Sequence, residues 1–126
     1  MPIHDISFEN GLYFARESGE ISLADAELWA KYAVLYASHS ETPIVALIDA
    51  RDVTFVTVEA RRIFVRASHI PNLHGACVAT KTVRNTQTSR IIGKMAQHDH
   101  TSVFETLEEA RWHAQRLLRD SSADVG

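Results

Sequence analysis

Residues 44–48 read Ile-Val-Ala-Leu-Ile, an unbroken apolar run with the length of one strand. A strand that is apolar on both faces belongs in the middle of a sheet that helices cover on each side. The run follows Pro43 and stops at Asp49. It predicts a central, buried strand of an α/β fold, with the carboxyl end of the strand at Asp49.

Strand and helix patterns alternate along the rest of the chain. Asn10-Gly11 supplies the positive φ angles of a tight turn between two alternating stretches, which predicts a hairpin. Apolar stripes at helical spacing predict four helices. The further elements are strands near 6–8, 12–17, 75–80 and 102–105 and helices at 22–39, 57–67, 86–97 and 106–118. The order ββαβαβαβα implies a five-stranded, mostly parallel sheet with the N-terminal antiparallel strand at an edge and four helices on both faces.

Size and charge set further limits. A chain of 126 residues has room for one domain, expected at 1–120, followed by a loose polar tail at 121–126. A net charge of −3 gives no broad basic field, so we expect no nucleic-acid partner. No run approaches the roughly 18 apolar residues of a membrane helix. The single cysteine, Cys77, and the absence of a signal-peptide pattern indicate a cytoplasmic location.

The central strand and the last helix carry a resemblance to a known family. The segment Ala-Leu-Ile-Asp at 46–49, followed by Val-Thr-Phe at 53–55, and the segment Val-Phe-Glu-Thr-Leu-Glu-Glu-Ala at 103–110 are the matching stretches. On these residues the chain resembles the STAS domain, and more narrowly the bacterial proteins similar to stage II sporulation protein AA, an anti-sigma-factor antagonist. The resemblance covers about residues 6–118 and implies a regulatory module that works through protein contacts.

One stretch departs from that family. Its antagonists are switched by phosphorylation of a serine at the start of the second helix, where this chain reads Thr57-Val58-Glu59. A carboxylate at that place is permanently charged and cannot be switched. Thr57 is interpreted as the N-cap of the helix. The resemblance therefore predicts a module that lacks the phospho-switch serine.

Polar residues gather where the predicted strands end. Ligands of open α/β sheets bind beyond the carboxyl ends of the strands. The second helix adds arginines one turn apart, which suit an anion or an acidic protein surface. The candidate ligand or partner surface comprises Asp49, Arg51, Asp52, Thr57, Glu59, Arg62, Arg66, Lys81 and Arg84. Two alternatives stay open: ion pairs at a loop rim and solvated helix faces.

Other patterns favour a protein without catalysis, metal or cofactor. The nucleophile elbow, the phosphate-cradling loop and the dinucleotide fingerprint are all missing from the sequence. Cys77 lies in an apolar run and is interpreted as a buried thiol. His98 and His100 lack further ligands at zinc spacing, so we expect no metal site there.

Aromatic residues occur on two of the predicted helices. Trp29, Tyr32 and Tyr36 form an apolar stripe, with Leu35 assigned to it, and we interpret this stripe as core packing. The rival hypothesis is a pocket beneath this helix, in a small enzyme or a lipid- or small-molecule-binding protein.

Trp112 falls nearly opposite the apolar stripe of the last helix, with Arg116 one turn away. Aromatic residues beside arginine are typical of contact surfaces. We therefore expect Trp112 and Arg116 at a homodimer interface. The alternative that stays open is that Trp112 folds sideways onto the loop near His98 and is buried within its own chain. The function favoured by the sequence is a non-catalytic regulatory or binding module that recognises a protein partner or a small anionic ligand.

Overall fold

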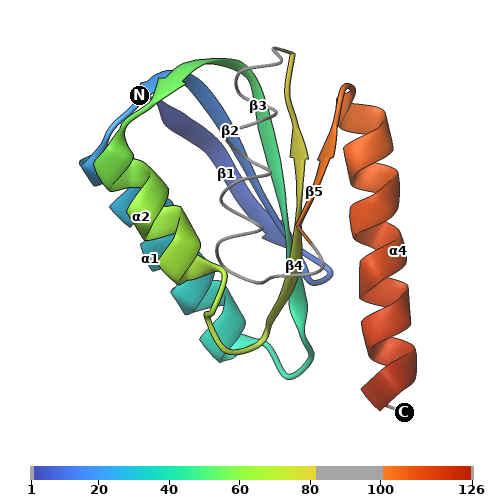
Figure 1. Cartoon of the computed structure of the whole chain (residues 1–126). Helices are drawn as coiled ribbons and strands as arrows, with labels where there is room; N and C mark the ends of the chain where they lie inside the picture. Colours follow the sequence, from blue (N-terminus) through green and yellow to red (C-terminus); the bar gives the residue numbers. More distant parts are fainter. Residues whose placement is uncertain (1, 82–100, 126) are drawn as a thin grey trace.

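The computed structural model describes residues 2–81 and 101–125 and contains one five-stranded sheet (Figure 1). The strands lie in the order in which they occur along the chain, β1-β2-β3-β4-β5. β1 pairs antiparallel with β2, and all later pairings are parallel. The elements are β1 (Ile3–Glu9), β2 (Leu12–Ile21), α1 (Leu23–His39), β3 (Ile44–Val56), α2 (Val58–Ala67), β4 (Leu73–Ala79), β5 (Thr101–Phe104) and α4 (Leu107–Val125).

The predicted α/β sheet is confirmed, with β1 as the antiparallel edge strand. Helices α1 and α2 cover one face, and α4 lies on the other (Figure 1). The described residues hold three helices; the helix predicted at 86–97 lies outside them. Helix α4 runs to Val125, through the segment predicted as a loose tail. Among the helices of the described ranges, none is long and apolar enough to span a membrane.

The predicted central strand is confirmed as buried, but its predicted end at Asp49 is wrong. Residues 44–50 are all buried, and β3 continues to Val56. Asp49 is the last residue that pairs with β4, opposite Ala79. Beyond it β3 still pairs with β2, as far as Ile21 opposite Val56. The second half of β3 persists because β2 extends far enough to pair with it, a cause that lies outside the sequence of β3 itself.

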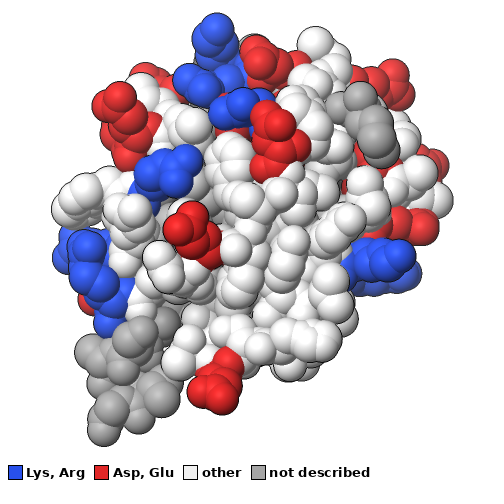
Figure 2. Space-filling view, turned by 180° about the vertical axis from the view of Figure 1, so that it is seen from behind, with Lys and Arg blue, Asp and Glu red and all other residues white. Residues whose placement is uncertain are grey.

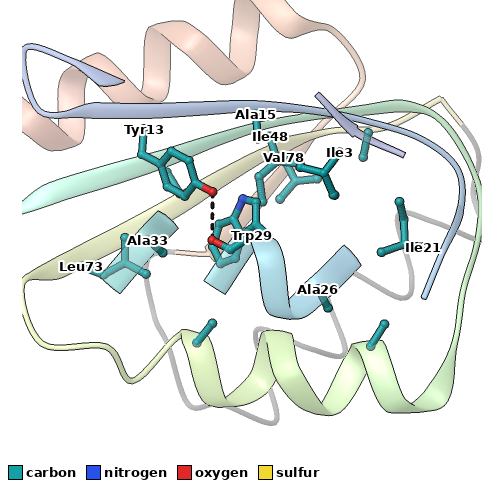
Figure 3. Packing of buried hydrophobic residues seen from close by; sticks show 14 of the residues in the cluster. Ile3, Tyr13, Ala15, Ile21, Ala26, Trp29, Ala33, Ile48, Leu73 and Val78 are labelled. Carbon is teal, nitrogen blue, oxygen red and sulfur yellow. Dashed lines mark hydrogen bonds between the residues drawn. The ribbon is translucent and has the colours of Figure 1, made fainter. Parts of the chain in front are cut away.

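The core between the sheet and α1 is built on aromatic rings. Tyr13 stacks on Trp29 with ring centroids 5.3 Å apart, and its hydroxyl donates to the Trp29 carbonyl at 2.9 Å (Figure 3). Phe8 stacks on Tyr36 at 4.7 Å, and Trp29 meets Phe64 of α2 at 5.6 Å. The aromatic stripe is thus confirmed as core packing. These rings occupy the space beneath α1 in which the rival hypothesis placed a pocket.

One residue assigned to that stripe is misplaced. Leu35 is 45% exposed, and its neighbour Val34 is 50% exposed. Helical spacing explains the error, because Leu35 lies about 100° from Tyr36 around the helix and falls beyond the edge of the buried face.

A second core lies between the sheet and α4. Val45 and Leu47 of β3 and Cys77 of β4 pack with Ala110 and Ala114 of the helix. Alanines on the inner face allow the helix to lie close to the sheet. Cys77 is fully buried, as predicted, and burial raises the pKa of its thiol to about 12. A thiol in that state is protonated at neutral pH and is not a nucleophile.

Helices α1, α2 and α4 begin within one residue of their predicted starts, each behind a side chain that caps it. Ser22 and Asp25 form a capping box at α1, in which each side chain bonds the backbone of the other residue. Thr57 accepts from the Ala60 amide at 3.1 Å, and Thr106 accepts from the Glu109 amide at 3.1 Å. These bonds satisfy backbone amides that a helix start otherwise leaves free.

Candidate functional site

Asp49 lies at the centre of an ion-pair network on the α4 side of the sheet. Arg51 donates from Nε to one carboxylate oxygen at 2.8 Å and from Nη2 to the other at 2.9 Å. Arg16 of β2 donates to Asp49 at 3.2 Å and to the exposed Asp5 at 2.9 Å. The four side chains join β1, β2 and β3.

The central carboxylate of this network is buried, which distinguishes the network from an ion pair on the surface. Asp49 is only 4% exposed, whereas both arginines are partly exposed. The hydrogen bond from Arg51 is the main cause that lowers the pKa of Asp49 below its ordinary value, and it outweighs the opposing effect of burial. Asp49 is therefore a fixed carboxylate that accepts bonds from both arginines. It does not serve as a proton donor near neutral pH.

Strands β4 and β5 end before β2 and β3 do, so the end of the sheet has a step, and the ion-pair network lies at this step. β4 and β5 both end level with Asp49, since Asp49 pairs with Ala79 and Ala79 with Phe104. The next residue after β4, Thr80, is buried, and its amide donates to the Phe104 carbonyl at 2.9 Å. Figure 2 shows positive and negative side chains lying together in the upper part of the face seen from behind, where β2 and β3 end.

The structure brings together only part of the predicted surface. Asp49 and Arg51 are bonded to each other within β3. Asp52, on β3 beyond Asp49, and Lys81, two residues after the end of β4, are both exposed. Arg84 lies outside the described residues.

The start of α2 presents a different surface. Thr57 is half-buried as the N-cap, and Glu59 is exposed. Val58 is 52% exposed, which is unusual for an apolar side chain at a helix start. Arg62 and Arg66 follow Val58 at intervals of four residues, and both are exposed. The four exposed residues Val58, Glu59, Arg62 and Arg66 form one surface along the helix, called here the α2 surface, and Thr57 is its cap.

Arg61 does not belong to that surface. Its side chain is partly buried, and its Nε atom is buried without a hydrogen-bond partner. At α-helical spacing Arg61 lies on the side of α2 that carries Phe64, which contacts Trp29 of α1. Arg61 thus packs at the edge between the two helices.

Sequence reasoning missed one titratable core residue, Glu17. It is 5% exposed, and its Oε1 atom has no hydrogen-bond partner. Burial, with a smaller contribution from Asp25, raises the pKa of Glu17 to about 8. Its spacing on β2 could have indicated this burial. Glu17 follows the buried residues Tyr13 and Ala15 at intervals of two, so all three lie on the same face of the strand.

Metal binding finds no support in the part of the chain that the structure describes. No group of three or more histidine, cysteine, aspartate or glutamate side chains there could hold an ion. His98 and His100 lie outside that part.

Comparisons with known proteins give a fold. No protein-family model matches the chain, and no curated protein matches it. An uncharacterised protein of the DUF3478 family with a SpoIIAA-like fold, from Shewanella loihica PV-4, superposes with a TM-score of 0.64 at 16% identity, over 89% of this chain and 91% of that one. An anti-sigma factor antagonist from Mycobacterium paratuberculosis gives 0.63 at 16% identity, over 87% and 91%.

A third solved structure is much larger. The murine Solute Carrier 26 family member A9 anion transporter matches with a TM-score of 0.55 at 15% identity, over 87% of this chain but only 18% of its own length. The two small proteins, by contrast, match along nearly their whole length and share the mixed sheet described above. This chain has a STAS-like fold of the SpoIIAA type.

Proposed function

We propose that this protein is a non-catalytic regulatory or binding module. The observation that carries the proposal is the state of Asp49, the buried acid at the step in the sheet. Two arginines bind it and hold it ionised, so it is structural and does not transfer protons. Cys77 is excluded as a nucleophile by its burial. An anti-sigma factor antagonist among the structures of similar fold supports a protein as the partner.

The α2 surface is the proposed binding surface. It combines an exposed apolar residue, Val58, with two exposed arginines, Arg62 and Arg66, along one side of the helix. Apolar contact beside arginine is typical of protein interfaces. The charge pattern fits an acidic protein surface or a small anionic ligand that reaches both guanidinium groups. Asp52 and Lys81 extend the candidate surface toward the step in the sheet.

Charge reversal on this surface tests the proposal. Arg62→Glu is expected to weaken partner binding at least about tenfold, because it places a carboxylate opposite an acidic surface. The partner is first captured from native cells with the immobilised wild-type protein and identified by mass spectrometry. Its affinity for each variant is then measured by calorimetry.

Arg111→Glu is the matched control, since Arg111 is an exposed arginine on α4, across the sheet from α2. It should leave the affinity unchanged. Equal affinity of wild type and Arg62→Glu, with the fold intact, would remove the α2 surface as the binding site.

Thr57 supports a second test. Its hydroxyl caps α2 and no serine stands beside it, so we propose that this helix start is not a phosphorylation switch. Thr57→Ala should lower the free energy of unfolding by about 1 kcal/mol, through loss of the cap alone. Partner affinity should not change. Incubation with an anti-sigma-type kinase should leave the intact mass unaltered; stoichiometric phosphate on Thr57 would contradict this.

The module is also proposed to form a homodimer, with Trp112 and Arg116 in the contact. Trp112 is 53% exposed on α4, which agrees with its predicted outward position. The Arg116 guanidinium lies 5.6 Å from the centre of its ring. An exposed indole beside arginine is typical of the centre of a protein contact.

A further inference from the structure

The outer side of α4 carries its charges in an ordered sequence around Trp112. Glu108 and Glu109 lie toward the N-terminal end, and Glu105 lies two residues before the helix begins. Toward the C-terminal end lie Arg116 and Arg119. All of these side chains are exposed, and α4 stands alone on its side of the sheet in the described structure (Figure 1).

The spacing of these charges is symmetric about the tryptophan. Glu108 precedes Trp112 by four residues and Arg116 follows it by four. Glu105 precedes it by seven and Arg119 follows it by seven. Every acid on one side of Trp112 thus has a counterpart at the same distance on the other side, and for two of the three acids that counterpart is an arginine.

Glu108 and Arg116 form no ion pair with any residue that the structure describes. Glu108 and Arg116 are eight residues apart, which is about 12 Å along a helix axis, too far for an ion pair. Within the described structure, both charges are therefore available to a second molecule.

From this pattern we infer that the occupant of the outer face of α4 is a second copy of the same helix, crossing it antiparallel about a two-fold axis at Trp112. An antiparallel arrangement brings Glu108 of each protomer beside Arg116 of its partner, and Glu105 beside Arg119. The two indoles meet at the axis. A two-fold contact needs only one self-complementary patch, which this face provides.

Helix geometry permits this contact. Glu108, Trp112 and Arg116 form one row at intervals of four residues, and the packing of such rows against each other is the commonest class of helix contact. A parallel arrangement would instead place Glu108 against Glu108 and Arg116 against Arg116, which like-charge repulsion disfavours. A contact of one helix from each protomer is small, so the dimer is expected to dissociate in the micromolar range.

The inference specifies the homodimer named in the proposed function, and paired charge reversals test its geometry. Glu108→Arg and Arg116→Glu are each expected to weaken dimerisation at least about tenfold, since each places like charges together at both ends. The double variant E108R/R116E restores every pair with its sign exchanged and is expected to dimerise like wild type. Sedimentation velocity between about 10 and 500 μM measures each association constant, and circular dichroism confirms that each variant is folded.

The outcomes separate the possible failures. A monomeric wild type would overturn the homodimer and the inference together, and would leave partner binding by the α2 surface intact. A dimer that both single reversals leave unchanged would overturn only the antiparallel contact. If Trp112→Ala, still folded, kept the full association constant, the position of the axis would be wrong. If both single variants dimerise weakly and the double variant regains the association constant of wild type, the arrangement is supported. Only an antiparallel contact pairs position 108 with position 116.

Discussion

Glu17→Gln is expected to stabilise the protein by about 3 kcal/mol at pH 7 and to raise its melting temperature by roughly 10 °C. Glu17 is buried, and one of its carboxylate oxygens has no hydrogen-bond partner. Its pKa of about 8 in the folded protein compares with an ordinary value of 4.5. At pH 7 the folded chain must therefore hold a proton that the unfolded chain releases.

The sign of the pH dependence follows from this difference. A group whose pKa is raised by folding makes its full contribution to stability below the unfolded value. That contribution is lost as the pH rises from 4.5 toward about 8. Glutamine has nearly the same shape and does not ionise, so the variant should show no such decline. Near pH 4 the two proteins should be about equally stable.

Urea unfolding between pH 4 and pH 9 measures the effect. Glu20→Gln is the matched control, because Glu20 is an exposed glutamate on the same strand, and it should change the stability by less than about 0.5 kcal/mol. Parallel curves for wild type and Glu17→Gln over the whole range would show that Glu17 titrates normally in the folded protein. The explanation from burial would then fail.

The elements that the sequence predicts well are those whose environment is encoded in their own residues. The run at 44–48 is apolar on both faces and forms the central strand. Ser22 and Thr57 are found at the helix starts that they cap. Helical spacing places Trp112 on the outer side of α4. In each case the residues that form the sequence pattern are the same residues that adopt the predicted structure.

The features that were missed depend on neighbours distant in the chain. Residues 50–56 mix polar and apolar side chains, and they remain a strand because β2 is long enough to pair with them. Glu17 is buried because α1 covers its face of β2, which the strand itself cannot reveal. The chemistry at Asp49 also could not be read from the sequence. Its proximity to Arg51 was visible, but Arg16 reaches it only because β2 lies beside β3.

Asp49→Asn is expected to destabilise the protein by about 2 kcal/mol at pH 7, the usual size of the loss when a buried group no longer takes part in charge-assisted hydrogen bonds. Asparagine keeps the shape but replaces one acceptor oxygen with a donor that faces the guanidinium groups of Arg16 and Arg51. Asp52→Asn, an exposed substitution of the same type nearby, should cost less than about 0.5 kcal/mol.

The pH dependence of this effect is opposite in sign to that of Glu17. Folding lowers the pKa of Asp49, so its stabilising contribution is present above the ordinary value of 3.8 and is lost as the pH falls below it. The destabilisation by Asp49→Asn should therefore shrink as the pH falls below 3.8. Wild type, which carries both groups, should be most stable between the two transitions, near pH 4 to 5. Measuring the free energy of unfolding of wild type and both variants from acid to alkaline pH checks this. If Asp49→Asn destabilised the protein at pH 2 as much as at pH 7, Asp49 would stabilise the fold by its shape and not by its charge.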